Sequence, residues 1–385
     1  MHKLENHLER PTTKDYYRNK FYIQDVLINR LENAEYEILK INTLVGFTHE
    51  YIYYFFVGMY FSSSNSNKEL INEIIENIHL KQNSLIAIFT IHHTQNKELL
   101  ENILAHCVCS LDKTKPAELT TEETHFMGEL LSQLPTDIVS KKPIAETRRE
   151  LRELEDKTLA KSGKPNEIEK TSISYEIGAI EINKGLRIIE VLGQILKNRG
   201  GSFEKRIVQD TLDNTISLGL RILSILLETL RTDEFTNWLG LAVDKADEEH
   251  FANHNKHLSD ERKKRFVERS IQMFSYVMTV TMLNRISDSI STEKMNEAVV
   301  LLANKNPTPA YRMVSFLARL SQNGIDTDEL KDLIATFDKN KNHWAKRTLS
   351  YYVQVYLNTH NVVYNERQKI FSIIKVDYIP NKFIP

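Results

Sequence analysis

Residues 173–230 read ISYEIGAIEINKGLRIIEVLGQILKNRGGSFEKRIVQDTLDNTISLGLRILSILLETL, and large apolar side chains recur through them every three or four positions. This spacing is typical of helices that bury one face. The first run ends at Asn198-Arg199-Gly200-Gly201, where glycine occupies the position at which helices commonly terminate. The second runs from about Phe203 to Leu230. Two amphipathic helices joined by a Gly-Gly turn predict an antiparallel helical hairpin.

Regular helix signals continue past residue 290. Helix starts are expected near Thr292, Pro309, Asp328 and His343. Ser291 can cap the first of these helices, and Asp326 with Glu329 forms a capping-box-like pair. Two helices then recur in about 34 to 36 residues, a period that suits stacked helical hairpins. The consensus side chains of tetratricopeptide and HEAT repeats are not evident, so the prediction is limited to helical hairpins.

These patterns divide the chain into three regions. Residues 1–140 are predicted to form a small N-terminal helical domain with room for a few short strands, such as Asn19–Ile23. Residues 141–170 mix both charges and are broken at Ser162-Gly163-Lys164-Pro165, which indicates a charged connector. Residues 171–385 are predicted to form an array of antiparallel helical hairpins, with one further strand candidate at Ile370–Asp377. The predicted fold class is mainly α.

The composition argues against several classes of protein. The 385 residues include 50 basic and 52 acidic side chains, and this near-neutral balance does not favour binding to nucleic acid or to a membrane surface. Two cysteines, Cys107 and Cys109, are too few for a disulfide-stapled secreted domain. No secretory signal follows Met1, and the most apolar windows are too short or too charged to span a membrane. We expect a cytoplasmic protein.

A family resemblance lies between Lys40 and Leu131. Residues 51–60, YIYYFFVGMY, resemble the YIYYFFVAKY helix of certain bacterial STAND P-loop NTPases, signal-transduction ATPases related to NACHT proteins and associated with antiphage defence. Residues 87–94, AIFTIHHT, are similar to the FLTHHS/T segment of that family. Residues 99–103 and 115–119 (KPAEL) resemble its IID-I and EPATL stretches, in the same order and at similar spacing.

The resemblance implies a region downstream of a nucleotide-binding core, where longer helical C-terminal parts often act as sensors. A Walker A loop requires G-x-x-x-x-G-K-[ST], because backbone amides cradle the phosphates and the lysine reaches the outer ones. This chain has no such string; Ser162-Gly163-Lys164-Pro165 contains the Gly-Lys pair but not the rest. No cofactor is therefore predicted. The expected partner is a protein or an NTPase-bearing subunit, and a homo-oligomer is compatible with this expectation.

The aromatic residues between Phe47 and Phe61 and the histidines of this region favour structural roles. A helix that is apolar all round is usually buried, so we predict that the aromatic side chains belong to a core. Adjacent His92 and His93 point about 100° apart on a helix, which disfavours a shared metal. His106, Cys107 and Cys109 have poor zinc spacing, because C-x-C is not followed by a second cysteine pair.

The best metal-like string is EEHFANHNKH, residues 248–257. If it is helical, His250, His254 and His257 fall at i, i+4 and i+7 on one face, and three imidazoles could reach one ion beside a carboxylate base. It is not H-E-x-x-H, and its asparagines and lysine favour a surface turn. The basic run Arg262-Lys263-Lys264-Arg265 follows closely behind a group of acidic residues, which favours a self-paired surface over a phosphate-binding one.

No nucleophile elbow, dinucleotide fingerprint or HEPN ribonuclease pattern occurs in the sequence, so no catalytic residue is predicted. The function predicted is a non-catalytic helical recognition or scaffold module, similar to the sensor part of a defence-associated STAND NTPase without its P-loop. The alternative is a metal-dependent hydrolase or nuclease centred on His250, His254 and His257. A third alternative is a degenerate gene fragment without an independent role.

Overall fold

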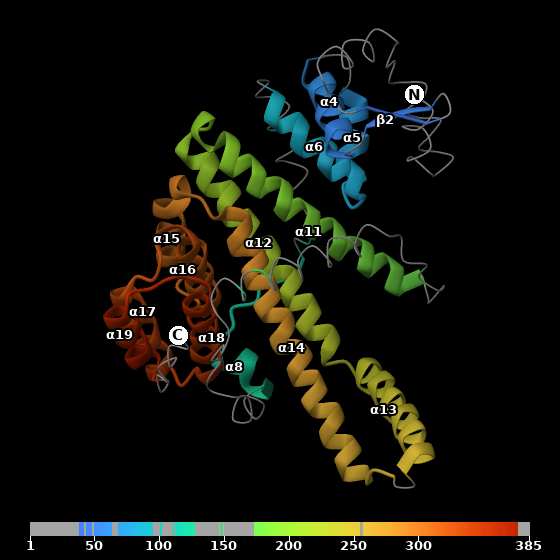
Figure 1. Cartoon of the computed structure of the whole chain (residues 1–385), viewed down its shortest axis with the longest axis vertical. Coiled ribbons are helices and arrows are strands. Elements are labelled where there is room, and N and C mark those ends of the chain that lie inside the picture. Colours follow the sequence, from blue (N-terminus) through green and yellow to red (C-terminus); the bar gives the residue numbers. More distant parts are fainter. Residues whose placement is uncertain are drawn as a thin grey trace. The chain divides into compact units, whose positions relative to one another are not determined.

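A computed structural model of the chain describes residues 38–41, 44–47, 50–63, 68–94, 113–127, 173–254 and 257–375, together with residues 101, 111, 146 and 149 (Figure 1). The chain divides into two compact units, Met1–Ile103 and Leu104–Pro385. The mainly α fold class is confirmed, since helices make up most of the described residues and two short strands accompany them.

In its described residues, the N-terminal unit combines a β-hairpin with three helices. Strands β1 (Ile38–Ile41) and β2 (Leu44–Phe47) are antiparallel, with Ile38 opposite Phe47 and Ile41 opposite Leu44. The helices are α4 (Glu50–Ser63), α5 (Lys68–Glu76) and α6 (Lys81–His93). The predicted strand Asn19–Ile23 lies outside the described residues, as do His106, Cys107 and Cys109.

Helices α4 and α6 pack closely because of Gly58. A methyl group at this position would lie 2.5 Å from Cβ of Phe89, so only glycine permits this approach. The aromatic helix is buried on one side, through Tyr53, Tyr54, Val57 and Phe61, whereas Tyr51, Met59 and Tyr60 are exposed. The prediction that these aromatic residues all belong to a core is therefore only partly correct. His93 packs edge-on against Phe55, with ring centroids 4.6 Å apart.

The second unit is built on the predicted hairpin. Helix α11 (Ile173–Arg199) ends in a 3-10 turn, η3 (Gly200–Ser202), and α12 (Lys205–Leu230) follows. Helix α14 (Asp260–Ile290) packs against both. The core of this three-helix layer is fully buried and includes Ile188, Ile189, Leu192, Leu212, Leu220, Leu223, Leu283 and Ile286. The sequence pattern thus placed both the helices and their turn correctly.

Five further helices complete the array. After the 3-10 turn η4 (Glu293–Met295) they are α15 (Asn296–Lys305), α16 (Pro309–Asn323), α17 (Thr327–Lys339), α18 (His343–Thr359) and α19 (Tyr364–Ile374). The predicted starts agree with α16, α17 and α18 to within one residue. The strand predicted at Ile370–Asp377 is wrong over Ile370–Ile374, because Ile370, Phe371 and Ile374 bury one face of α19 instead.

Two predicted caps need correction. The Ser291 hydroxyl donates to the carbonyl of Ala318, 2.7 Å away, and caps no helix. Asp326 does cap α17, since its Oδ1 accepts from the amides of Asp328 and Glu329. The Glu329 carboxylate, however, pairs with Arg319 on α16, so the reciprocal half of the capping box is not formed. In both cases a tertiary partner replaces a local one.

Residues 115–119, which we call the clasp, run between three helices. The Ala117 amide donates to the carbonyl of Leu220 on α12, over 3.0 Å. The Glu118 carbonyl accepts from the amide of Ala310 on α16, also over 3.0 Å. The Leu119 carbonyl accepts from Nδ2 of Asn342 at the start of α18, over 2.8 Å. A short helix, α8 (Thr121–Thr124), and the 3-10 turn η2 (His125–Met127) follow the clasp.

The clasp bears on the domain boundary predicted at residue 140. It lies within the second unit and is hydrogen-bonded to it, so the described part of residues 104–140 packs with the C-terminal helices. The predicted connector, residues 141–170, lies outside the described residues except for Glu146 and Arg149.

Among the helices that the structure describes, none combines the length and apolarity required to cross a bilayer.

Candidate protein-interaction surface

Helices α13 (Asp233–His254) and α14 form a second hairpin of the C-terminal unit. In Figure 1, α13 and the start of α14 lie at the end of the unit remote from α15 and α16. Helix α13 packs mainly against α14 and makes few contacts with α12. Its first turn carries Asp233 and Glu234, which suit the positive end of the helix dipole, and the Thr232 hydroxyl accepts from the Phe235 amide over 3.2 Å. The outer half of the hairpin must therefore be held together by its own contacts.

Those contacts form a small apolar core. Leu239 and Val243 on α13 are buried against Val267 on α14, with Phe235 and Ile271 packed beside them. The positions 235, 239 and 243 repeat every four residues, as do 267 and 271, so each helix contributes one narrow row. A two-helix hairpin has only this one internal interface, and apolar side chains outside these rows have no helix to cover them within the hairpin.

A buried carboxylate holds the loop end of the hairpin. Asp247 accepts the Leu258 amide at Oδ1, over 2.8 Å, and at Oδ2 it lies 3.0 Å from Lys263 Nζ and 3.1 Å from His257 Nδ1. These interactions, above all the Leu258 hydrogen bond, lower the pKa of Asp247 to about 2. Lys263 also reaches Asp244 Oδ1, 2.8 Å away, and the hydrogen bonds to Asp244 and Asp247 raise its pKa. These ion pairs and hydrogen bonds hold the turn between α13 and α14 in place. They agree, for Lys263, with the prediction that the basic run pairs with the acidic residues before it.

The three predicted metal ligands do not share a helical face. Helix α13 carries His250 and His254 and ends at His254, so His257 follows it in non-helical chain. The structure does not describe the side chains of His250 and His254, and the His257 ring contacts Asp247. Within the part of the chain that the structure describes, no cluster of three His, Cys, Asp or Glu side chains is arranged to hold a metal ion. The metal site stays a prediction.

Among the described residues of the two helices, six large apolar side chains are exposed, and we call them the apolar strip. The strip comprises Trp238 and Leu241 on α13, and Phe266, Met273, Phe274 and Val277 on α14. Leu241 is 71% exposed, Trp238 60% and Phe266 57%. Phe235 links the two helices beneath them, because its ring lies 5.6 Å from that of Trp238 and 6.3 Å from that of Phe274.

The strip occupies one side of the hairpin. Trp238 precedes the core residue Leu239 by one position, and Phe266 likewise precedes Val267. Each step along a helix turns the side chain by about 100° in the same sense. When two antiparallel helices face each other, the residue just before a core residue points to the same side of the pair on both helices. Met273 and Val277 lie seven and eleven residues after Phe266, so helical spacing keeps them on this side. Leu241 lies three residues after Trp238 but two after Leu239, about 200° from the core row, so it borders this side at the outer edge of α13.

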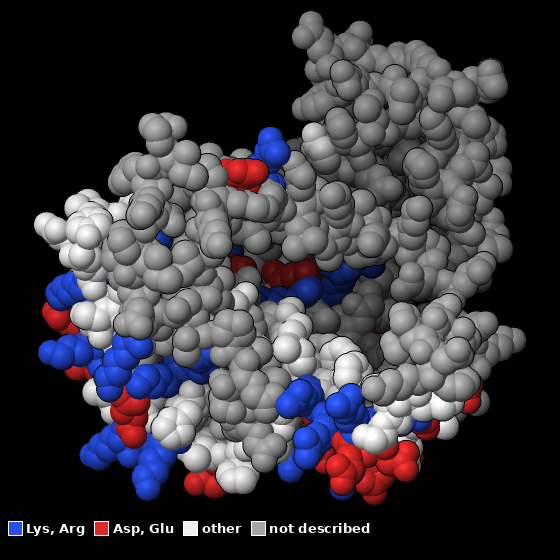
Figure 2. Space-filling view, turned by 60° about the horizontal axis from the view of Figure 1, so that its bottom comes forward, with Lys and Arg blue, Asp and Glu red and all other residues white. Residues whose placement is uncertain are grey.

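Charges of opposite sign border the strip on its two helices. The exposed acidic residues Glu234, Glu248 and Glu249 lie on α13, with Lys245 among them. The exposed basic residues Arg262, Arg265 and Arg269 lie on α14. Figure 2 shows that acidic and basic side chains form small neighbouring patches on the face it presents. The hairpin therefore offers an apolar centre between an acidic and a basic edge.

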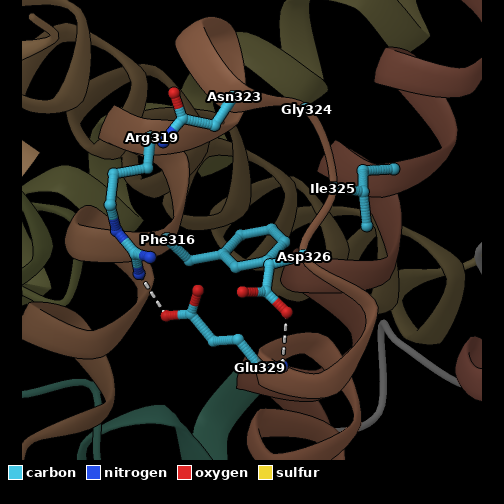
Figure 3. A pocket seen from close by; sticks show the side chains of 7 residues that line it. All are labelled: Phe316, Arg319, Asn323, Gly324, Ile325, Asp326 and Glu329. Atoms are coloured by element: carbon cyan, nitrogen blue, oxygen red, sulfur yellow. Dashed lines mark hydrogen bonds and ion pairs between the residues drawn. The ribbon is translucent and has the colours of Figure 1, made fainter. Parts of the chain in front are cut away.

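A small pocket lies elsewhere, between the end of α16 and the start of α17 (Figure 3). Its volume is about 260 Å³, and it is lined by Phe316, Arg319, Asn323, Gly324, Ile325, Asp326 and Glu329. Arg319 and Glu329 pair with each other across it, and Asp326 caps α17. Pockets that enclose a small molecule usually measure about 300–1,000 Å³. The pocket is smaller than that, and its charged groups already have partners.

The apolar strip was not predicted from the sequence, although a signal for it was present. Apolar residues occur in adjacent pairs, Trp238-Leu239, Phe266-Val267 and Met273-Phe274, which makes the apolar arc wider than one helix pair can bury.

Comparisons of the chain with protein-family models, with curated proteins and with solved structures each give no match.

Proposed function

We propose that this protein is a non-catalytic helical recognition or scaffold module that acts through protein–protein contact. The apolar strip of the α13–α14 hairpin carries the proposal. Exposed contiguous apolar patches of several hundred Å² commonly mark interaction sites on folded monomers. Tryptophan, phenylalanine and methionine, which make up four of the six strip residues, are enriched at protein interfaces.

The charged edges support a protein partner over other ligands. Anionic membranes and nucleic acids bind positively charged surfaces, whereas the acidic residues Glu234, Glu248 and Glu249 border this strip on α13. A protein surface can match an apolar centre with both an acidic and a basic edge.

The resemblance to STAND NTPases supplies the context of the proposal. Because the sequence contains no Walker A loop, nucleotide hydrolysis in such a system would belong to another chain. We therefore propose a sensor-like or scaffold role alongside an NTPase-bearing subunit. The clasp corresponds to the segment that resembles the EPATL stretch, and its three main-chain links to α12, α16 and α18 give that segment a structural role in this proposal.

Site-specific photo-crosslinking tests the interaction role. A photoreactive amino acid is placed at Leu241 in the full chain, expressed in its native cell, and compared with the same group at Val363, which is also 71% exposed but lies before α19. Discrete protein adducts are expected at Leu241 and lost when Trp238 is replaced by aspartate. Equal adduct yields at Leu241 and Val363 would contradict the proposal, because the strip would then behave as ordinary surface.

The metal-dependent hydrolase or nuclease is the second candidate. Two observations favour it. His250 and His254 are one turn apart on α13, and a carboxylate, Asp247, contacts His257, as outer partners of metal-bound histidines often do. Elemental analysis of the untagged protein separates the two functions. Transition metal near one per chain, lost in His254→Ala, would support the enzyme and count against the recognition module.

A further inference from the structure

We infer that the partner of the apolar strip is a second copy of this chain. Two α13–α14 hairpins would pack face to face about a two-fold axis that runs along the hairpins, so that α13 of each copy lies against α14 of the other. The result is a four-helix bundle in which neighbouring helices are antiparallel. This inference rests on the proposed function and names the partner for the same surface.

The size of the strip suits this arrangement. From the usual area of such side chains, the exposed parts of the six strip residues amount to on the order of 500 Å². A standard interface buries about 800 Å² on each partner, with an apolar centre and a polar rim. The strip supplies the centre, and the charged edges of α13 and α14 supply the rim. The bundle also provides what a single hairpin lacks, a second apolar interface for Trp238, Leu241 and Phe266.

The charges select the second copy. The ion pair between Asp247 and Lys263 places these two residues at one level of the hairpin. Glu248 and Glu249 follow Asp247, and Arg262 precedes Lys263, so acidic and basic edges lie side by side near the loop end. A rotation about an axis along the hairpin preserves the level and exchanges the helices. The acidic edge of each copy then faces Arg262 of the other copy, twice per dimer.

The other face-to-face symmetry is disfavoured by the same charges. A two-fold axis across the hairpin would stack α13 on α13 and α14 on α14. Glu248 and Glu249 of one copy would then face α13 of the other copy, on the edge where Glu234 lies. The basic edge of α14 would likewise face the basic edge of the other α14. Like charges across an interface cost several kcal/mol. The surface is therefore complementary to itself in one orientation, which is the property an isologous interface requires.

Size-exclusion light scattering on the untagged full chain tests the inference. Over roughly 1–100 µM, a range that covers ordinary dimer affinities, we expect a concentration-dependent shift from one to two chains. Leu241→Asp should raise the dimer dissociation constant about tenfold, since it places a charge within the apolar strip. Val363→Asp, at a residue of equal exposure, should leave the dissociation constant unchanged. Far-UV circular dichroism of each variant shows whether the fold is kept.

Charge reversal tests the orientation of the dimer. The double variant Glu248→Arg, Glu249→Arg should weaken dimerisation about tenfold, and adding Arg262→Glu and Arg265→Glu should recover most of the loss. A reversal that is not rescued in this way would overturn the proposed axis. A chain that stays monomeric at the highest concentration would overturn the second-copy inference. The proposed function would survive that result if Leu241 still gave adducts with another protein, and would fail with it if Leu241 and Val363 gave equal yields.

Discussion

The side-chain amide of Asn342 donates a hydrogen bond to the main-chain carbonyl of Leu119, 2.8 Å away and 223 positions earlier in the sequence. The same side chain caps α18, since its Oδ1 accepts from the Ala345 amide over 2.9 Å. Leu119 has a φ of +58°, in the left-handed region that non-glycine residues rarely adopt. Asn342 thus holds a strained turn of the clasp and the start of a helix at once, and it is buried.

We expect Asn342→Ala to lower the free energy of unfolding by about 2–4 kcal/mol. The substitution removes a helix cap, commonly about 1 kcal/mol, and leaves the buried Leu119 carbonyl without its donor, about 1–3 kcal/mol. Urea unfolding followed by tryptophan fluorescence measures the change. Asn340→Ala is the matched control, because Asn340 is exposed and its side chain lies outside the clasp, and it should cost less than about 0.5 kcal/mol. Similar costs for the two variants would show that the clasp bond contributes little.

Periodicity in the sequence was enough to predict the helical array but not its local details. The α11–α12 hairpin was found because apolar spacing and a Gly-Gly turn agree over residues 173–230. Caps were less predictable because a serine or glutamate that can bond its own helix can also bond a distant one. Ser291 reaches Ala318 and Glu329 reaches Arg319, and neither tertiary partner is visible in the local sequence.

The interaction surface was missed for a different physical reason. A helical pattern states which residues could be buried, while the number of neighbouring helices decides which of them are. Helix α11 meets α12 and α14 and buries Ile188, Ile189 and Leu192, whereas among the described elements α13 packs mainly against α14 and leaves Trp238 and Leu241 exposed. The predicted histidine site depended on continuous helix through His257, and α13 ends at His254.

Two glycines of α11 should respond to alanine in opposite directions. A methyl group at Gly193 would lie 2.4 Å from the carbonyl oxygen of Ser289 on α14, so Gly193→Ala must push two packed helices apart. We expect it to destabilise the fold by about 1–3 kcal/mol. A methyl group at Gly178 meets nothing within 4 Å, and Gly178→Ala should stabilise the helix by about 0.5–1 kcal/mol. Thermal unfolding of both variants measures the difference, and equal signs would contradict the close approach of α11 and α14.

A phenol links α16 to α12. The Tyr311 hydroxyl donates to Asp213 Oδ1 over 2.7 Å and lies 2.9 Å from the Ser217 hydroxyl. Burial raises the pKa of Tyr311, so the phenol stays protonated and remains a donor. We expect Tyr311→Phe to cost about 1.5–3 kcal/mol, the range for a hydrogen bond to a charged group. A double-mutant cycle with Asp213→Ala in urea unfolding isolates the pair, and additive losses would show that the two side chains do not interact.

The loop end of the α13–α14 hairpin should lose stability in acid through Asp247. The pKa of this carboxyl is about 2 in the folded chain and about 4 when unfolded, so its contribution is complete above about pH 4 and is lost as the pH falls towards 2. Asp247→Asn retains an acceptor for the Leu258 amide but removes the charge that Lys263 meets. The melting temperature of wild type should therefore exceed that of the variant by a constant amount from pH 6 to pH 4, and the gap should close between pH 4 and pH 2. A gap that stays constant down to pH 2 would mean that protonation of Asp247 is not linked to folding. A variant as stable as wild type at pH 6 would mean that the charged form adds nothing to the hairpin.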